Sequence, residues 1–143
     1  MAHRDANHFR FFDQTGFAAG VNLFSEPVNL GRIPVCAHWI GMHANFTYAG
    51  ADGGQLDVFL QTSLDYGLTW CDIANIHFLQ ASARRFTGCS STITLGVATW
   101  NPGYLTIADN TVLQGLIGDY IRVAVAPVNA YATSRLVVDV VIR

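Results

Sequence analysis

Hydrophobic and polar residues alternate along much of the chain from residue 28 onward, in short runs that turn residues separate. In the clearest run, every second residue from Leu56 to Thr62 falls on one face, and the residues between them fall on the other. A period of two residues is typical of a β-strand whose two sides meet different environments. The same alternation returns near the C-terminus, from Leu136 to Ile142. We therefore expect strands rather than helices.

Turn signals divide this pattern into about eight or nine short antiparallel strands, spaced roughly every 8–12 residues. Such spacing, without a convincing amphipathic helix, predicts an all-β sandwich or jelly roll. The first strand is broken near Gly31 and Pro34, which predicts an edge strand because proline cannot donate to a ladder. Besides the hairpin described next, the expected strands cover residues 28–38, 39–48, 84–97, 104–107, 111–116, 120–127 and 136–142.

Residues 55–78 predict a β-hairpin with its turn chemistry visible in the sequence. An Asp in the turn accepts backbone N–H groups, and a Gly tolerates positive φ. The turn matches the pattern Ser-x-Asp-x-Gly-x-Thr-Trp through Ser63, Asp65, Gly67, Thr69 and Trp70. This motif resembles the Asp-box turns of sialidase-type propeller blades, where it is a structural staple that recurs in each chain. Here it occurs once, in a chain too short for a propeller, so the resemblance implies the hairpin and not sialidase activity.

The first 27 residues contain several phenylalanines without a steady helical or strand period, among them Phe9, Phe11 and Phe12. A disordered tail would be poor in aromatic residues. We therefore expect residues 1–27 to form an extended arm that docks its phenylalanines, followed by a β-sandwich domain at 28–143. Docking on the chain's own core and docking on a neighbouring subunit both remain open.

The composition indicates a single domain with an unusually apolar surface. Of the 143 residues, 51% are hydrophobic and only 13% are charged, against a usual charged share of about 25%. No apolar run approaches the roughly 20 residues of a membrane helix, so we expect no membrane partner. A sparsely charged chain of this kind is expected to bury surface against copies of itself or other proteins, although a small, well-filled β-domain would have a similar composition.

The charge and the cysteine content limit the classes of partner and the cellular compartment that we expect. The net charge is −2, and all eight basic residues are arginines, whose rigid donor fork suits protein interfaces; a GC-rich genome would also favour arginine over lysine. The largest basic cluster is Arg84-Arg85, which is too small for nucleic-acid binding. Three cysteines, Cys36, Cys71 and Cys89, form no CxxC motif, and no signal-peptide-like segment begins the sequence. We expect reduced thiols and synthesis in a cytoplasm.

Residues with chemical potential do not assemble into a predicted site. His38 and His43 would point to opposite faces of one strand, which argues against a local metal site, although a trimer axis could gather one of them. The aspartates near the hairpin could indicate glycosidase carboxylates or a calcium site. Asp65 is used by the turn, however, and no second carboxylate is placed as a glycosidase requires. The three aspartates near the hairpin are Asp57, Asp65 and Asp72. We expect that the chain is not an enzyme and that it has no catalytic, cofactor-binding or metal-binding residues.

The hairpin, together with the motif Gly118-Asp119-Tyr120-Ile121-Arg122 and a terminal apolar strand, resembles small β-sandwich virion proteins of tailed bacteriophages. The resemblance covers residues 55–143. It implies a structural protein of the virion, made in the host bacterial cytoplasm, and most closely a capsid decoration (cement) protein. Its partners would be its own copies, as a homotrimer, and the major capsid protein or another virion protein.

Two other roles remain open. A head–tail or tail structural protein of a phage is the first alternative. A carbohydrate-binding β-sandwich module is the second alternative, because exposed aromatic residues bind sugars in such folds. For that role Tyr66 is the residue of interest, because its place at the hairpin tip should expose it.

Overall fold

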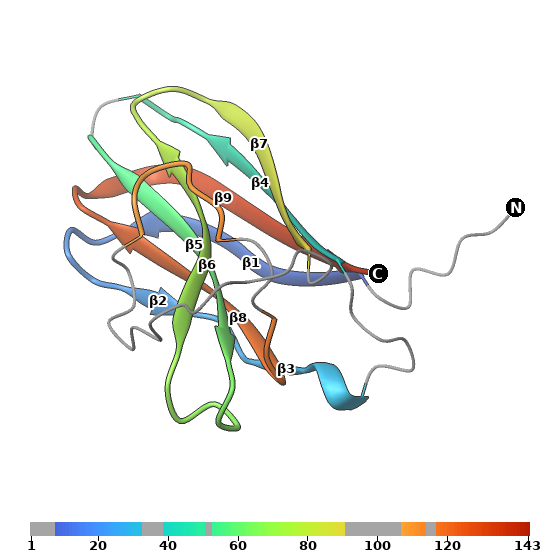
Figure 1. The fold of residues 1–143 in the computed structure, drawn as a ribbon. Coiled ribbons are helices and arrows are strands. Elements are labelled where there is room, and N and C mark those ends of the chain that lie inside the picture. Colours follow the sequence, from blue (N-terminus) through green and yellow to red (C-terminus); the bar gives the residue numbers. More distant parts are fainter. Residues whose placement is uncertain (1–7, 33–38, 51–52, 91–106, 114–116) are drawn as a thin grey trace, which may run out of the picture.

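The computed structural model describes residues 8–32, 39–50, 53–90, 107–113 and 117–143. These residues form nine antiparallel strands and one short 3-10 turn, with no α-helix among them, so the all-β prediction is confirmed (Figure 1). No helix in this part of the chain is long and apolar enough to cross a membrane. The elements are β1 (His8–Phe17), β2 (Leu23–Phe24), β3 (Val28–Asn29), the 3-10 turn (Leu30–Arg32), β4 (Trp39–Thr47), β5 (Leu56–Ser63), β6 (Cys71–Phe78), β7 (Ala83–Ser90), β8 (Tyr120–Pro127) and β9 (Tyr131–Ile142).

The strands lie in two sheets that form a sandwich-like arrangement (Figure 1). One sheet has the order β1-β9-β4-β7, and the other has the order β2-β8-β5-β6 with β3 also paired to β8. The pairing is nested along the chain. The first strand pairs with the last, the short strands β2 and β3 pair with β8, β4 pairs with β7, and β5 pairs with β6.

The core lies between the sheets and follows the predicted alternation. Leu136, Val138, Val140 and Ile142 of β9 are fully buried, as the two-residue period predicts. They belong to the same hydrophobic cluster as the inward side chains of β5. The ring of Phe46 on β4 lies 5.3 Å from that of Phe78 on β6, which links the two sheets through an aromatic contact.

The central hairpin and β4 are confirmed, and β9 differs from its predicted limits. It begins at Tyr131, before the strand that we expected at 136–142. The Tyr131 ring is fully buried, and its hydroxyl accepts a hydrogen bond from the Gly54 N–H at 3.1 Å. This long-range bond satisfies a polar group inside the core, which local turn residues do not reveal.

Four other predicted strands are described only in part. Within 28–38, strand β3 is two residues long and a 3-10 turn follows it, while 33–38 lie outside the described residues. Within 84–97, β7 extends to Ser90, and residues 91–97 lie outside the described residues. Of the predicted strand at 104–107, residues 104–106 also lie outside the described residues. The described part of 111–116 contributes one isolated bridge, between Val112 and Ala74 of β6.

The N-terminal arm requires a revised boundary, because residues 8–17 form strand β1 of the sandwich itself. The strand pairs with β9, and Phe9, Phe11 and Phe12 are half-buried against the core of their own chain. Residues 8–17 therefore dock on the core of their own chain, which is one of the two modes left open by the sequence. Register shifts between Arg10 and Phe12 and between Thr15 and Phe17 explain why no steady period marks this strand.

Candidate functional site

The turn between β5 and β6 is held by the carboxylate of Asp65. Its Oδ1 accepts hydrogen bonds from the Thr69 backbone N–H and from the Ser63 hydroxyl, both at 2.8 Å. Its Oδ2 accepts one from the Thr69 hydroxyl at 2.7 Å. The Thr69 hydroxyl bond is the largest influence that lowers the pKa of Asp65 below its ordinary 3.8. The carboxylate therefore holds the turn in its charged form.

Further bonds fix the remaining turn residues. The Ser63 hydroxyl oxygen accepts the Gly67 N–H at 2.8 Å, and the Trp70 indole donates to the Gly67 carbonyl at 3.1 Å. Gly67 has φ of 87° and Tyr66 has φ of 58°, so two successive residues adopt the left-handed region. A bulky residue rarely takes this conformation unless its surroundings impose it. The motif thus builds a rigid projection.

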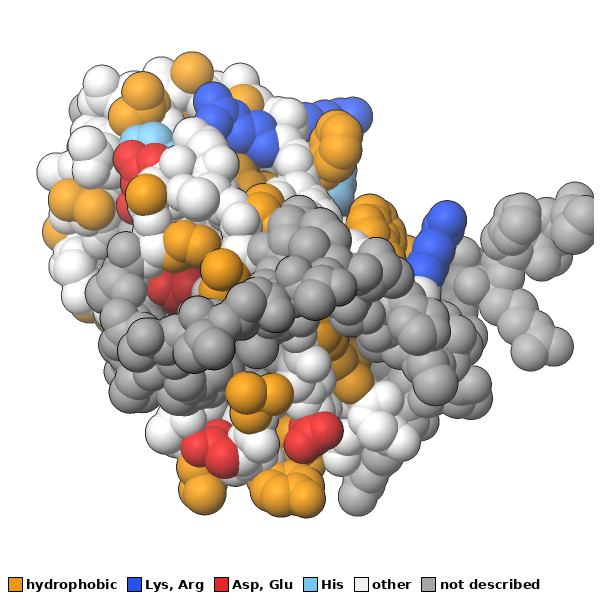
Figure 2. Space-filling model, in the orientation of Figure 1, with side chains coloured by type: hydrophobic (Ala, Val, Ile, Leu, Met, Phe, Trp, Pro, Cys, Tyr) orange, Lys and Arg blue, Asp and Glu red, His pale blue; other side chains and the backbone are white. Residues whose placement is uncertain are grey.

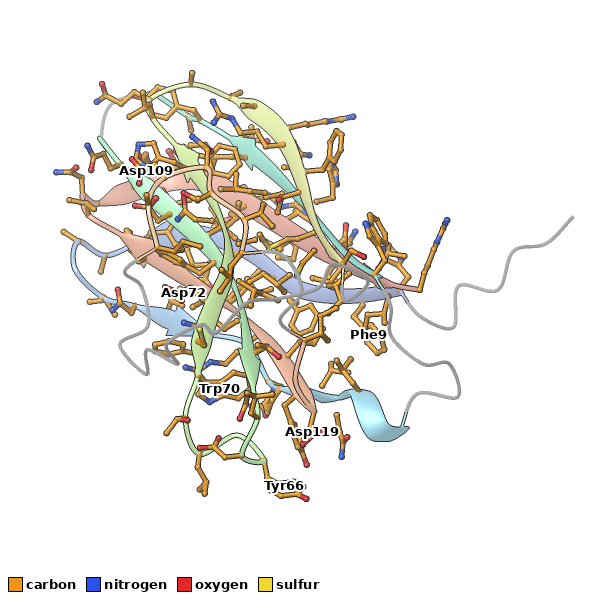
Figure 3. The ribbon with its side chains drawn as sticks, viewed as in Figure 1. Phe9, Tyr66, Trp70, Asp72, Asp109 and Asp119 are labelled. Carbon is orange, nitrogen blue, oxygen red and sulfur yellow. The ribbon has the colours of Figure 1, made fainter. Side chains whose placement is uncertain are left out.

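This rigid projection presents apolar side chains to solvent. Tyr66 is 78% exposed and Leu68 is 83% exposed, and Leu64 before them is also exposed. We call these three residues the hairpin tip. Figure 3 places Tyr66 at the end of the hairpin, pointing away from the sandwich, and Figure 2 shows hydrophobic side chains at that end of the molecule. Large apolar groups held in a fixed, exposed turn are typical of a contact surface rather than of a solvated loop.

The base of the hairpin is packed around Arg122 of β8. Its guanidinium carbon lies 4.2 Å from the centre of the Trp70 ring and 4.4 Å from that of Phe24. Its Nε donates to Gln61 Oε1 at 2.8 Å, and Gln61 Nε2 donates in turn to Asp72 Oδ1 at 2.7 Å. Arg122 on β8 therefore connects β2 and β5 to Trp70, the residue at which the turn ends.

Residues Gly118 and Asp119 bring β8 against this base. The Gly118 N–H donates to the Thr62 hydroxyl at 2.7 Å, and the Asp119 N–H donates to the Ser63 carbonyl at 2.9 Å. A Cβ on Gly118 would stand 2.0 Å from the Ser63 carbonyl oxygen, so only glycine allows this approach. The Gly-Asp-Tyr-Ile-Arg motif is thus an architectural element beside the hairpin.

A second apolar surface lies on the outer face of the sheet β1-β9-β4-β7. Trp39 of β4 and Phe86 of β7 are 41% and 84% exposed. The Trp39 ring occupies the space above Gly41 and Gly88, where added Cβ atoms would meet it at 2.2 Å and 2.9 Å. The two aromatic residues border a groove of about 120 Å³ that His43 and Val141 also line. We call this area the Trp39 face.

A third group consists of Asp57, His77 and Asp109, of which the sequence singled out only Asp57. His77 Nδ1 lies 2.8 Å from Asp57 Oδ1 and 3.6 Å from Asp109 Oδ2. Register across the hairpin places Asp57 opposite His77. A register shift between Leu60 and Gln61 intervenes, so counting outward from the turn would have placed Ile76 there instead. Asp109 comes from a segment that reaches β6 only through tertiary pairing, and no local signal predicts that.

The other candidate residues are distributed without forming a catalytic constellation in the described part of the chain. Asp57, Asp65 and Asp72 have separate partners, namely His77, the turn and Gln61. Cys71 and Cys89 are buried, His43 is exposed on β4, and Cys36 and His38 lie outside the described residues. No protein-family model, no curated protein and no solved structure matches the chain.

Proposed function

We propose that the chain is a structural protein of a bacteriophage virion, acting as a capsid decoration protein. It would associate with its own copies, as a homotrimer, and bridge subunits of the capsid. No catalytic step belongs to this role. The observation that carries the proposal is the hairpin tip, a rigid projection whose apolar side chains face solvent.

The strand order supports a jelly roll as the finer description of the sandwich. If β2 and β3 are counted as one interrupted strand, eight strands pair as first with last, second with second-last, and so inward to the β5–β6 hairpin. Two sheets built by such nested pairing are typical of jelly rolls, which occur in viral capsid proteins. This supports the virion proposal at the level of architecture.

The energetics of the tip support association with protein. Burying a large apolar side chain contributes about 1.5–3 kcal/mol relative to leaving it exposed. The backbone at Tyr66 and Leu68 is already held by the Asp65 turn, so their burial would cost side-chain entropy but little further backbone entropy. A lattice of capsid subunits would repeat this contact many times and add avidity.

The test combines the mass in solution with binding to capsids. Light scattering of the purified protein is expected to give three times the 15.6 kDa of one chain. The double variant Tyr66→Ser/Leu68→Ser is expected to stay folded and to lose binding to capsid shells of the source phage. Val128→Ser is the matched control, since Val128 is an exposed apolar residue in the β8–β9 connection, away from the tip.

Each result has a definite meaning. A monomer would remove the homotrimer from the proposal, and unchanged capsid binding by the double variant would remove the tip as the contact. Binding to isolated tails or connectors instead of shells would favour the head–tail or tail role.

A carbohydrate-binding role is the second candidate, and the exposure of Tyr66 and Trp39 favours it. Both present aromatic rings to solvent, as sugar-stacking residues do. Tyr66→Ala would then abolish retention on a glycan column while leaving the oligomer mass intact. If the variant and the wild type behave alike on a panel of glycans, this role is excluded for the tip.

A further inference from the structure

The cluster of Asp57, His77 and Asp109 brings three metal-ligating side chains to one point. They come from β5, from β6 and from the segment 107–113 that pairs with β6. Their ligand atoms all lie within 4.8 Å of one another. The cluster lies at the end of β6 opposite to the hairpin tip, as the labels of Asp109 and Tyr66 show in Figure 3.

The spacing suits one ion. Ligand atoms each about 2.0–2.2 Å from a common Zn²⁺ ion lie roughly 2.8–3.6 Å apart, depending on the coordination number. The distances from His77 Nδ1 to Asp57 Oδ1 and to Asp109 Oδ2 are 2.8 and 3.6 Å. Small side-chain movements would therefore place all three ligands around an ion.

Burial is graded across the cluster in the way that an accessible site requires. The side chains of Asp57 and His77 are only 13% and 11% exposed, whereas that of Asp109 is 63% exposed. The two inner ligands are held by the strands, and the outer one faces solvent. Water molecules could complete the coordination from the side of Asp109.

A network of asparagines positions these ligands. Asn75 Nδ2 donates to Asp57 Oδ1 at 3.2 Å, and Asn75 Oδ1 accepts the Asn110 N–H at 2.9 Å. Asn110 Oδ1 accepts the His77 backbone N–H at 3.1 Å. Asn75 Nδ2 and His77 Nδ1 both meet Asp57 Oδ1, so an ion that replaces the hydrogen of His77 would bind the same oxygen that Asn75 orients. Partners of this kind orient metal ligands and fix their geometry.

We propose that Asp57, His77 and Asp109 bind a divalent transition-metal ion of the Zn²⁺ class. One imidazole nitrogen and two carboxylate oxygens suit Zn²⁺, Co²⁺ or Mn²⁺, whereas Ca²⁺ and Mg²⁺ prefer oxygen ligands alone. The ion takes the place of the hydrogen shared between His77 and Asp57. Because it joins β5 and β6 to residues 107–113, it stabilises the folded chain by binding it in preference to the unfolded one.

The test uses the full-length protein with Co²⁺ as a spectroscopic probe and Zn²⁺ in calorimetry. Asp109→Asn preserves side-chain size and removes one exposed ligand, so folding is expected to be unaffected. The wild type is expected to bind one ion at this site and to show a raised thermal midpoint in Zn²⁺. Asp109→Asn should weaken that binding by at least about tenfold, since even outer-sphere changes cost metal sites about 10–100-fold.

The controls separate this site from other ligands in the chain. Asp119→Asn changes an exposed loop aspartate outside the cluster, and His43→Gln removes an exposed imidazole on β4. Both should keep the tight site and the thermal shift, while His77→Gln should lose them as Asp109→Asn does. The proposal is overturned if the wild type binds no ion, if Asp109→Asn and His77→Gln keep wild-type affinity, or if Asp119→Asn loses affinity to the same extent.

Discussion

The guanidinium of Arg122 lies 4.2 Å from the centre of the Trp70 ring, and this contact connects β8 to the end of the hairpin turn. Trp70 also donates its indole N–H to Gly67 within the turn. Arg122, which is distant in sequence, therefore contributes to the position of the hairpin tip relative to the sandwich, together with Gly118 and Asp119. Replacing Arg122 would therefore affect both the stability of the folded chain and the orientation of the hairpin tip.

Replacing Arg122 is expected to loosen the base of the hairpin. Arg122→Ala removes two cation–π contacts, each contributing about 0.5–2 kcal/mol, and the Nε donor to Gln61. We expect a loss of about 2–3 kcal/mol in the free energy of unfolding, measured by urea denaturation. Arg122→Lys should recover only part of it, because an ammonium group does not stack as a plane. Arg84→Ala on β7 is the control, and an equal loss there would contradict a specific role for Arg122.

The two left-handed residues of the turn should respond in opposite ways. Gly67→Ala places a Cβ at φ of 87° and is expected to cost about 1–2 kcal/mol of unfolding free energy. Tyr66→Asn, at φ of 58°, should be neutral or slightly stabilising, because asparagine tolerates this conformation better than tyrosine. Thermal denaturation of both variants checks this. Equal destabilisation by the two would indicate that the Tyr66 side chain, and not its backbone, supports the turn.

The Asp65 carboxylate predicts a specific acid sensitivity. Its pKa is lowered in the folded chain from the ordinary 3.8, first by the Thr69 hydroxyl, so the folded state binds this proton less readily than the unfolded state. Its contribution to stability is present above pH 3.8 and is lost as the pH falls through the lower folded pKa. Asp65→Asn should therefore be less stable than the wild type at pH 7, and the difference should shrink below pH 3.8. Urea unfolding from pH 7 to pH 2.5 measures it, and a difference that stays constant over this range would exclude the carboxylate charge as the cause.

The hairpin was predictable because its information is local. Ser63, Asp65 and Gly67 act within one turn. The alternation from Leu56 to Thr62 identifies the side of β5 that joins the core, although Phe59 and Gln61 on the other side are buried as well. The same reasoning found the buried face of β9, where one sheet supplies a regular period. The sequence therefore predicted the elements that are stabilised by interactions between residues close to one another along the chain.

The features that the sequence did not predict depend on contacts between distant segments of the chain. The bulge at Phe11 shifts the period of β1, so an edge strand was interpreted as an arm. Asp109 meets His77 only because Thr111 and Leu113 exchange backbone hydrogen bonds with β6. Loop placement of that kind carries no periodic signal, and a carboxylate in a turn sequence gives no sign of its partner.

The position of β1 predicts how the domain responds to truncation. Deleting residues 1–13 removes the strand from His8 to Asp13 and, with it, three phenylalanines that are half-buried against the core. It also removes the ion pairs of β1 with β9, which join Arg10 to Asp139 at 2.9 Å and Asp13 to Arg135 at 2.8 Å.

We expect this truncation to lower the free energy of unfolding by about 3 kcal/mol or more, if each half-buried ring contributes roughly half of its full transfer energy. Deleting residues 1–7, which leaves β1 complete, should cost far less. Chemical denaturation of the two truncations makes the comparison, with amide hydrogen exchange in β9 as a local readout. If the shorter and longer deletions are equally stable and β9 stays protected in both, β1 acts as a detachable arm and is available to a neighbouring subunit.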